Sequence, residues 1–66
     1  MVKCNLSRLM GERRINISEL ARETGLNRST VTLLYNDGAK RIDLEAIENI
    51  CRFLNCEISD LLELKD

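Results

Sequence analysis

The chain has 66 residues, which is enough for one domain with a small hydrophobic core. It contains no histidine, the commonest general base and metal ligand, and its two aromatic residues are too few for a base-stacking platform, so an enzyme, a metal site and a single-strand binder are disfavoured. The net charge of −1 conceals a gradient, because residues 1–42 hold eight Lys and Arg against four Asp and Glu, whereas residues 43–66 hold two against seven.

The first predicted element is a helix over residues 3–13, indicated by apolar residues at helical spacing: Val2, Leu6, Leu9 and Met10. Gly11 lies inside this helix and costs it about 1 kcal/mol relative to alanine. No alternating pattern is long enough to predict a strand, so we expect an all-α fold. No apolar run approaches the ~18 residues of a membrane span, and no signal peptide is expected.

Four more helices are predicted by a recurring start pattern, in which an apolar residue precedes a polar cap and packs against another apolar residue five positions later. The caps and bounds are Asn16 for residues 17–24, Asn27 for 28–35, Asp43 for 44–54 and, more weakly, Glu57 for 58–63. Glu19 lies three residues after Asn16, which is the spacing of a capping box.

The predicted second and third helices are joined by a tight connection, Thr24–Gly25–Leu26–Asn27. Gly25 stands where a left-handed residue ends a helix, and glycine adopts that conformation without a side-chain clash. The apolar residues that would hold two crossing helices together are Leu20, Leu26, Val31 and Leu34. This pattern is typical of a helix-turn-helix, whose second helix enters the DNA major groove.

The stretch from Ile15 to Asn36 resembles the helix-turn-helix of the Cro and phage-repressor family, also called the XRE family. The matching residues are Leu20–Ala21, Gly25–Leu26–Asn27, Val31, Leu34 and Asn36, and the later matching segments are Ile42–Glu45, Leu54–Cys56 and Asp60–Leu62. The resemblance covers nearly the whole chain. It implies a compact five-helix, lambda-repressor-like DNA-binding domain over residues 1–66. It also implies a transcription regulator that binds double-stranded DNA sequence-specifically, most often as a two-fold dimeric repressor.

One departure from the family concerns Ile17, because many members have a glutamine there that meets a phosphate. Only the backbone contact is expected at this position. By the same resemblance, one face of the third helix reads base edges, and the residues implied are Arg28, Ser29, Thr32 and Leu33. Arg28 has the two N–H groups needed to bind guanine O6 and N7. The candidate phosphate-binding residues are Asn27, Asn36, Lys40 and Arg41.

The predicted fourth helix carries more apolar residues than one stripe needs. Leu44, Ile47, Cys51 and Leu54 are expected to face the core, with Cys51 packing rather than reacting. The surplus apolar residues predict a homodimer interface made of Ile50, Phe53, Leu62 and Leu64. The alternative is that a small domain simply buries a wide stripe.

Two functions of different kinds remain open at this stage. The first is a DNA-binding repressor that acts as a homodimer on a palindromic operator. The second is an antitoxin-type module that binds a toxin and represses its own operon, and such a module is expected to carry an extra segment that wraps the toxin. The sequence indicates no cofactor and no small-molecule effector. Three cysteines at no metal spacing, Cys4, Cys51 and Cys56, favour the reducing cytoplasm.

Overall fold

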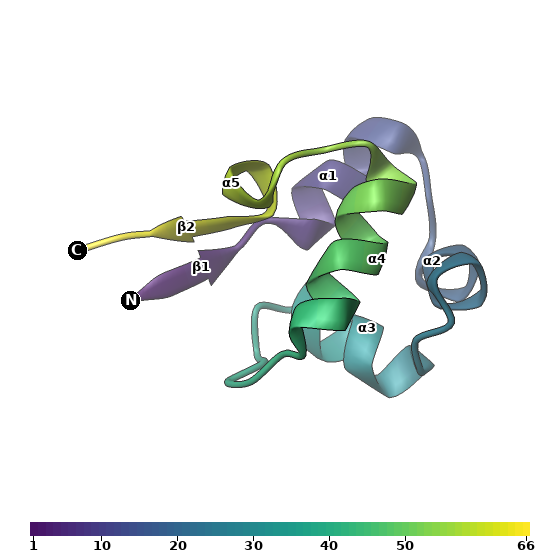
Figure 1. Cartoon of the computed structure of the whole chain (residues 1–66), viewed down its shortest axis with the longest axis horizontal. Coiled ribbons are helices and arrows are strands. Elements are labelled where there is room, and N and C mark those ends of the chain that lie inside the picture. The colour runs from purple at the N-terminus through teal and green to yellow at the C-terminus, as the bar shows by residue number, and fades with distance from the viewer.

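The computed structural model describes all residues, 1–66, and contains five helices and two short strands (Figure 1). In chain order the elements are β1 (Val2–Cys4), α1 (Leu6–Arg13), α2 (Ile17–Thr24), α3 (Arg28–Tyr35), α4 (Leu44–Leu54), α5 (Ile58–Leu61) and β2 (Leu62–Leu64). The all-α class and the bounds predicted for α2, α3 and α4 are confirmed. None of the helices is long and apolar enough to cross a membrane.

The two strands were missed by the sequence analysis. β1 and β2 pair antiparallel, with Val2 opposite Leu64 and Cys4 opposite Leu62. The predicted first helix therefore begins at Leu6 rather than at residue 3, and the predicted fifth helix ends at Leu61 rather than at 63. The reason is that this pairing joins the two ends of the chain, whereas periodicity within a short window reports only local structure.

The recurring start pattern correctly identified residues that build the core. The second apolar residue of each pair is buried, and the first packs partly buried against the same core; the pairs are Ile15 and Leu20, Leu26 and Val31, Ile42 and Ile47, and Cys56 and Leu61. Leu6, Met10 and Ile50 complete the centre of this core with almost no exposed surface. Burial of this apolar surface is the main source of the fold's stability.

The predicted caps differ in detail. The Asn16 side chain accepts a hydrogen bond from the Glu19 N–H at 2.8 Å, as expected, but Glu19 makes no return bond. Asn27 and Asp43 occupy the cap positions in extended conformation without a side-chain cap bond. The start of α5 is instead stabilised by Asp60, whose carboxylate accepts from the Glu57 N–H at 2.9 Å.

The turn between α2 and α3 has the predicted chemistry. Gly25 has φ 75°, the left-handed conformation that glycine adopts most readily. The Thr24 hydroxyl donates to the Leu20 carbonyl at 2.7 Å and accepts from the Leu26 N–H at 3.4 Å. This buried side chain therefore satisfies backbone groups on both sides of the turn, and it fixes how α3 leaves α2.

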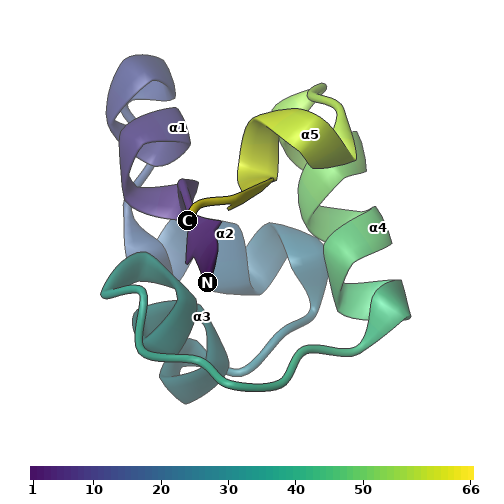
Figure 2. The ribbon, with the colours of Figure 1, turned by 90° about the vertical axis from the view of Figure 1, so that its left-hand side faces the viewer.

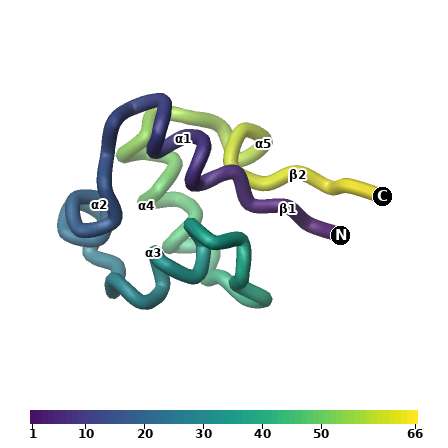
Figure 3. The backbone as a smooth tube through the Cα atoms, turned by 180° about the vertical axis from the view of Figure 1, so that it is seen from behind, coloured from purple at the N-terminus to yellow at the C-terminus, as the bar shows by residue number.

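The ribbon formed by β1 and β2 projects from one end of the molecule, and α2 lies at the other end (Figures 1 and 3). The overall extents are 33 × 21 × 19 Å. Asp37, in the long connection between α3 and α4 (Figure 2), accepts a hydrogen bond from the Cys4 N–H at 2.9 Å. Asn5 is buried at the base of the ribbon, where its amide donates to Glu63 at 3.2 Å. These bonds attach the ribbon to the helices.

Candidate nucleic-acid interface

One face of α3 is polar and open to solvent. All four predicted base-reading residues are exposed on this helix: Arg28, Ser29, Thr32 and Leu33. Val31 and Leu34 point the other way and are buried in the core. The buried residues fix the rotation of the helix about its axis, and the helix therefore holds the four exposed side chains at one surface.

Local hydrogen bonds orient the polar side chains of this face. The Thr32 hydroxyl donates to the Arg28 carbonyl at 2.8 Å, so its donor is used within the helix. The Ser29 hydroxyl donates to the Asn27 amide oxygen at 3.3 Å, which leaves the amide NH₂ group of Asn27 free to donate outward. Arg28 makes no ion pair, so its guanidinium is available to a ligand.

The start of α3 borders a polar hollow. It is lined by Asn27, Thr30 and Arg41 together with residues at the start of α4. Because no side chain caps α3, its first N–H groups remain free to bind an anion. The structure thus brings two of the predicted phosphate-binding residues, Asn27 and Arg41, to the same place, although they are far apart in sequence.

The other two predicted phosphate-binding residues lie elsewhere. Asn36 is exposed at the C-terminal end of α3, where its backbone N–H bonds to the Thr32 carbonyl. Lys40 is exposed in the connection between α3 and α4, and it lines a hollow with Val2 and Asp37 rather than the one at the start of α3. Lys40 and Arg41 are therefore not equivalent, although they are adjacent in sequence.

A third hollow lies between α3 and the start of α2, and the sequence analysis did not anticipate it. Its polar lining includes Arg28, Tyr35, Asn16 and Ser18. Tyr35 follows Arg28 by seven residues, which is two helical turns, so both reach the same side of α3. The seven-residue spacing could have placed Tyr35 beside Arg28 from the sequence alone. Ser18 belongs to the neighbouring helix α2, so its place in this hollow could be found only from the folded structure.

The predicted dimer interface is only partly available at the surface. Ile50 has 0% of its surface exposed, so its inclusion was wrong: the core of one chain already uses this side chain. Phe53 and Leu62 are partly buried against the same core, and Leu64 is 81% exposed on β2. Leu44 was expected in the core but is 83% exposed, because it is the first residue of α4 and lies beyond the packed stripe.

Two sequence comparisons agree on the kind of protein to which this chain is similar. The model of the Cro/C1-type HTH DNA-binding domain matches residues 5–66. The HTH-type transcriptional regulator YozG of Bacillus subtilis (strain 168), itself uncharacterized, is 31% identical over 61 residues, which are 92% of this chain and 73% of that protein.

Two solved structures share the fold. A candidate DNA-binding protein from Bacteroides fragilis matches with a TM-score of 0.84 at 16% identity, over 96% of this chain and 100% of that chain. SinR, the master regulator for biofilm formation, solved in complex with DNA, matches with a TM-score of 0.75 at 17% identity, over 82% of this chain and 86% of that chain.

Proposed function

The chain belongs to the Cro/C1-type helix-turn-helix family of DNA-binding transcriptional regulators, and on that premise we propose that it is a repressor that binds a palindromic operator as a homodimer. In this proposal the 66 residues act as one DNA-binding domain, and the activity is binding rather than catalysis. A DNA partner also fits the cytoplasmic location expected from the sequence.

The observation that carries the proposal is the exposed polar face of α3. A helix presented in this way can enter the major groove, where base edges display distinct donor and acceptor patterns. In our proposal Arg28 donates to a guanine, and the Ser29 hydroxyl oxygen accepts from a neighbouring base edge, because its proton is already donated to Asn27. The methyl groups of Thr32 and Leu33 contact thymine methyl groups. Thr32 is assigned an apolar contact because its hydroxyl proton is already used within the helix.

The hollow at the start of α3 and the hollow between α3 and the start of α2 support binding of the DNA backbone. We propose that Asn27, Arg41 and the free N–H groups at the start of α3 bind one phosphate. The hollow lined by Ser18 and Tyr35 at the start of α2 would hold a second phosphate, from the other side of the groove. Contacts on both sides of the helix would set its depth and register on the duplex, which base contacts alone do not do.

We propose the ribbon as the dimer surface. Leu64 and Val2 face each other across the two strands and are 81% and 63% exposed, and Met1 beside them is 84% exposed. The next pair in the register, Lys3 with Glu63, lies on the opposite face of the ribbon and carries one charge of each sign, so it adds no net charge to the ribbon. Leu64 belonged to the interface predicted from the sequence, and it is retained here. Val2 takes the place of Ile50, which is buried in the core.

The position of the ribbon suits a two-fold operator. The longest extent of the molecule is 33 Å, and the ribbon lies at one end of it (Figure 1). Two copies joined at their ribbons would separate their α3 helices by a distance on the order of one such extent, which is comparable to the ~34 Å between successive turns on one face of DNA.

Repression is tested by transcription in vitro. A site recovered by selection from random duplexes is placed over a core promoter, and RNA synthesis is measured with increasing protein. We expect synthesis to fall with the wild type and to persist with Arg28→Ala at the same concentrations. A rise in synthesis on binding would identify an activator and contradict the repressor proposal.

A further inference from the structure

Two of the three cysteines lie together at the C-terminal end of α4. Cys51 is in the last turn of this helix, and Cys56 is in the link to α5. Asn55 between them has φ 53°, the Cys56 N–H donates to the Cys51 carbonyl at 3.0 Å, and the Asn55 N–H donates to the Arg52 carbonyl at 3.3 Å. These are the bonds of a Schellman motif, in which the side chains at the two outer positions usually touch.

The same motif ends α1, and the comparison makes the cysteine pair distinctive. There the Ile15 N–H donates to the Met10 carbonyl at 3.0 Å, and the outer positions hold two ordinary apolar side chains. At the end of α4 both outer positions hold thiols, and both thiols are free. A pair of apolar residues would satisfy the packing requirement equally well, so the thiols add chemistry that the fold itself does not need.

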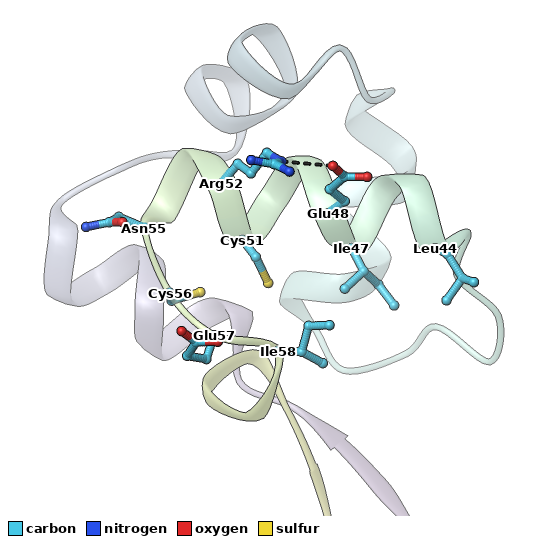
Figure 4. Close-up of a pocket in the computed structure, with 9 residues that line it drawn as sticks. All are labelled: Leu44, Ile47, Glu48, Cys51, Arg52, Asn55, Cys56, Glu57 and Ile58. Atoms are coloured by element: carbon cyan, nitrogen blue, oxygen red, sulfur yellow. Dashed lines mark hydrogen bonds and ion pairs between the residues drawn. The ribbon is translucent and has the colours of Figure 1, made fainter.

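The geometry permits a bond between the two sulfur atoms. Because covalent lengths within a residue are fixed, a 3.0 Å backbone hydrogen bond keeps the Cα atoms of Cys51 and Cys56 within roughly 7 Å of each other. Disulfides typically join Cα atoms ~4.4–6.8 Å apart. Figure 4 shows both side chains lining one groove, with the Cys56 Sγ on the side toward Cys51.

The groove gives small molecules access to this pair. It has a volume of about 610 Å³, it opens to solvent, and its apolar lining includes Leu44, Ile47 and Ile58. Cys56 is partly exposed in it, whereas Cys51 is only 8% exposed. Burial, reinforced by the neighbouring Cys56 thiol and by the Asp60 and Glu57 carboxylates, raises the pKa of Cys51 to about 11. Cys51 therefore stays protonated near neutral pH, and Cys56 is the thiol that an incoming reagent meets first.

We propose that Cys51 and Cys56 form a redox-active dithiol site whose substrate is a low-molecular-weight disulfide. The Cys56 sulfur, as a thiolate, attacks one sulfur of that disulfide; a mixed disulfide forms, and the first small thiolate leaves and takes up a proton. The Cys51 sulfur then loses its proton and attacks the Cys56 sulfur, which breaks the mixed disulfide and releases the second small thiol. The two cysteines lose two electrons in total, and the external disulfide gains them as two thiols.

Oxidation would join the last turn of α4 covalently to the link before α5, across the floor of the groove. Cys4 provides an internal control, because it lies on β1 at the base of the ribbon with Asp37 as its neighbour. Burial raises the pKa of Cys4, and the charged group that acts on this thiol is Asp37 rather than a second thiol that could resolve a mixed disulfide. We therefore expect the internal disulfide to form between Cys51 and Cys56 and not to involve Cys4.

The test uses the full chain, reduced, freed of reductant and treated with excess glutathione disulfide before intact mass and peptide mapping. We expect the wild type and Cys4→Ser to lose two hydrogens and to yield a peptide that links Cys51 to Cys56. Cys51→Ser should stop with one glutathione on Cys56, and Cys56→Ser should form no internal link. Circular dichroism checks that each variant is helical.

Three results would overturn the proposal: a wild type that stays reduced, one that keeps glutathione on Cys56 without closing the internal bond, or one that links cysteines of different molecules instead. Because all three are read on wild-type protein, a poorly folded variant does not obscure the outcome.

Discussion

Arg28 is an exposed guanidinium without a carboxylate partner, placed in the first turn of α3. If it binds a guanine, Arg28→Ala should cost roughly 1–3 kcal/mol of operator affinity and relax the preference at one base position. Affinities for a panel of single-base operator variants measure both effects. Arg22→Ala is the matched control, because Arg22 is exposed on α2 and its Nε atom already lies 3.4 Å from the Oε2 atom of Glu23. A preference profile left unchanged by Arg28→Ala would remove this residue from the readers.

Substitution of two glycines by alanine is expected to change the stability of the fold in opposite directions. Gly25 has φ 75°, so Gly25→Ala forces a side chain into the left-handed region and should destabilise the fold by about 1–2 kcal/mol, even though a Cβ there would meet no other atom. Gly11 lies within α1 with ordinary φ and open space around it, so Gly11→Ala should stabilise by about 0.5–1 kcal/mol. Urea unfolding measures both. Equal effects of the two substitutions would contradict this reading of the backbone.

At the scale of elements, the start of α3 and the connection before α4 form one phosphate-binding unit in our proposal. Arg41→Ala should weaken binding about equally on all sequences and reduce the salt slope by roughly one unit. Lys40→Ala should have the smaller effect, because Lys40 does not line the hollow at the start of α3. Anisotropy titrations at several salt concentrations compare them, with Arg52→Ala as the control, because Arg52 already pairs with Glu48 on α4. A change in base preference without a change in slope would indicate base reading by Arg41.

The elements also show where sequence reasoning succeeds and where it stops. Local signals sufficed for α2, α3 and α4, because caps, Gly25 and apolar spacing all act within one or two turns. The ribbon could not be predicted in this way, since Val2 and Leu64 meet only after the helices have packed. For the same reason the exposed face of α3 was predicted correctly, whereas the grouping of Asn27 with Arg41 and of Arg28 with Ser18 required the folded chain.

Surface exposure was the hardest property to predict. Ile50 and Leu44 have similar character and lie on the same helix, yet one is fully buried and the other is 83% exposed. Ile50 lies within the packed part of α4, whereas Leu44 is the first residue of this helix and lies beyond the packed stripe. Helical spacing places Leu44 on the same side as Ile47 and Cys51, but it does not show where along the helix the packing ends. The proposed interface therefore omits Ile50 and uses the ribbon, on which the predicted interface residues Leu62 and Leu64 lie.

At the scale of the whole molecule, the ribbon is the proposed contact between two copies. Leu64→Asp places a charge at its exposed apolar pair and should give a folded monomer with much weaker operator affinity and nearly intact nonspecific binding. Leu44→Asp is the matched control, since Leu44 is as exposed as Leu64 but lies on α4. Sedimentation at micromolar concentration, with circular dichroism for folding, decides between them. Loss of the dimer in Leu44→Asp alone would move the interface to the α4 surface.

The most direct test of the central claim, that two copies read DNA symmetrically through α3, is a binding selection from random duplexes. We expect the wild-type chain to enrich a palindrome whose half-sites are centred about 10 base pairs apart, one helical turn of DNA. We also expect Arg28→Ala to lose the enrichment of one symmetric pair of bases while keeping the spacing. Recovered duplexes with no common sequence, or with a single unrepeated half-site, would contradict the account.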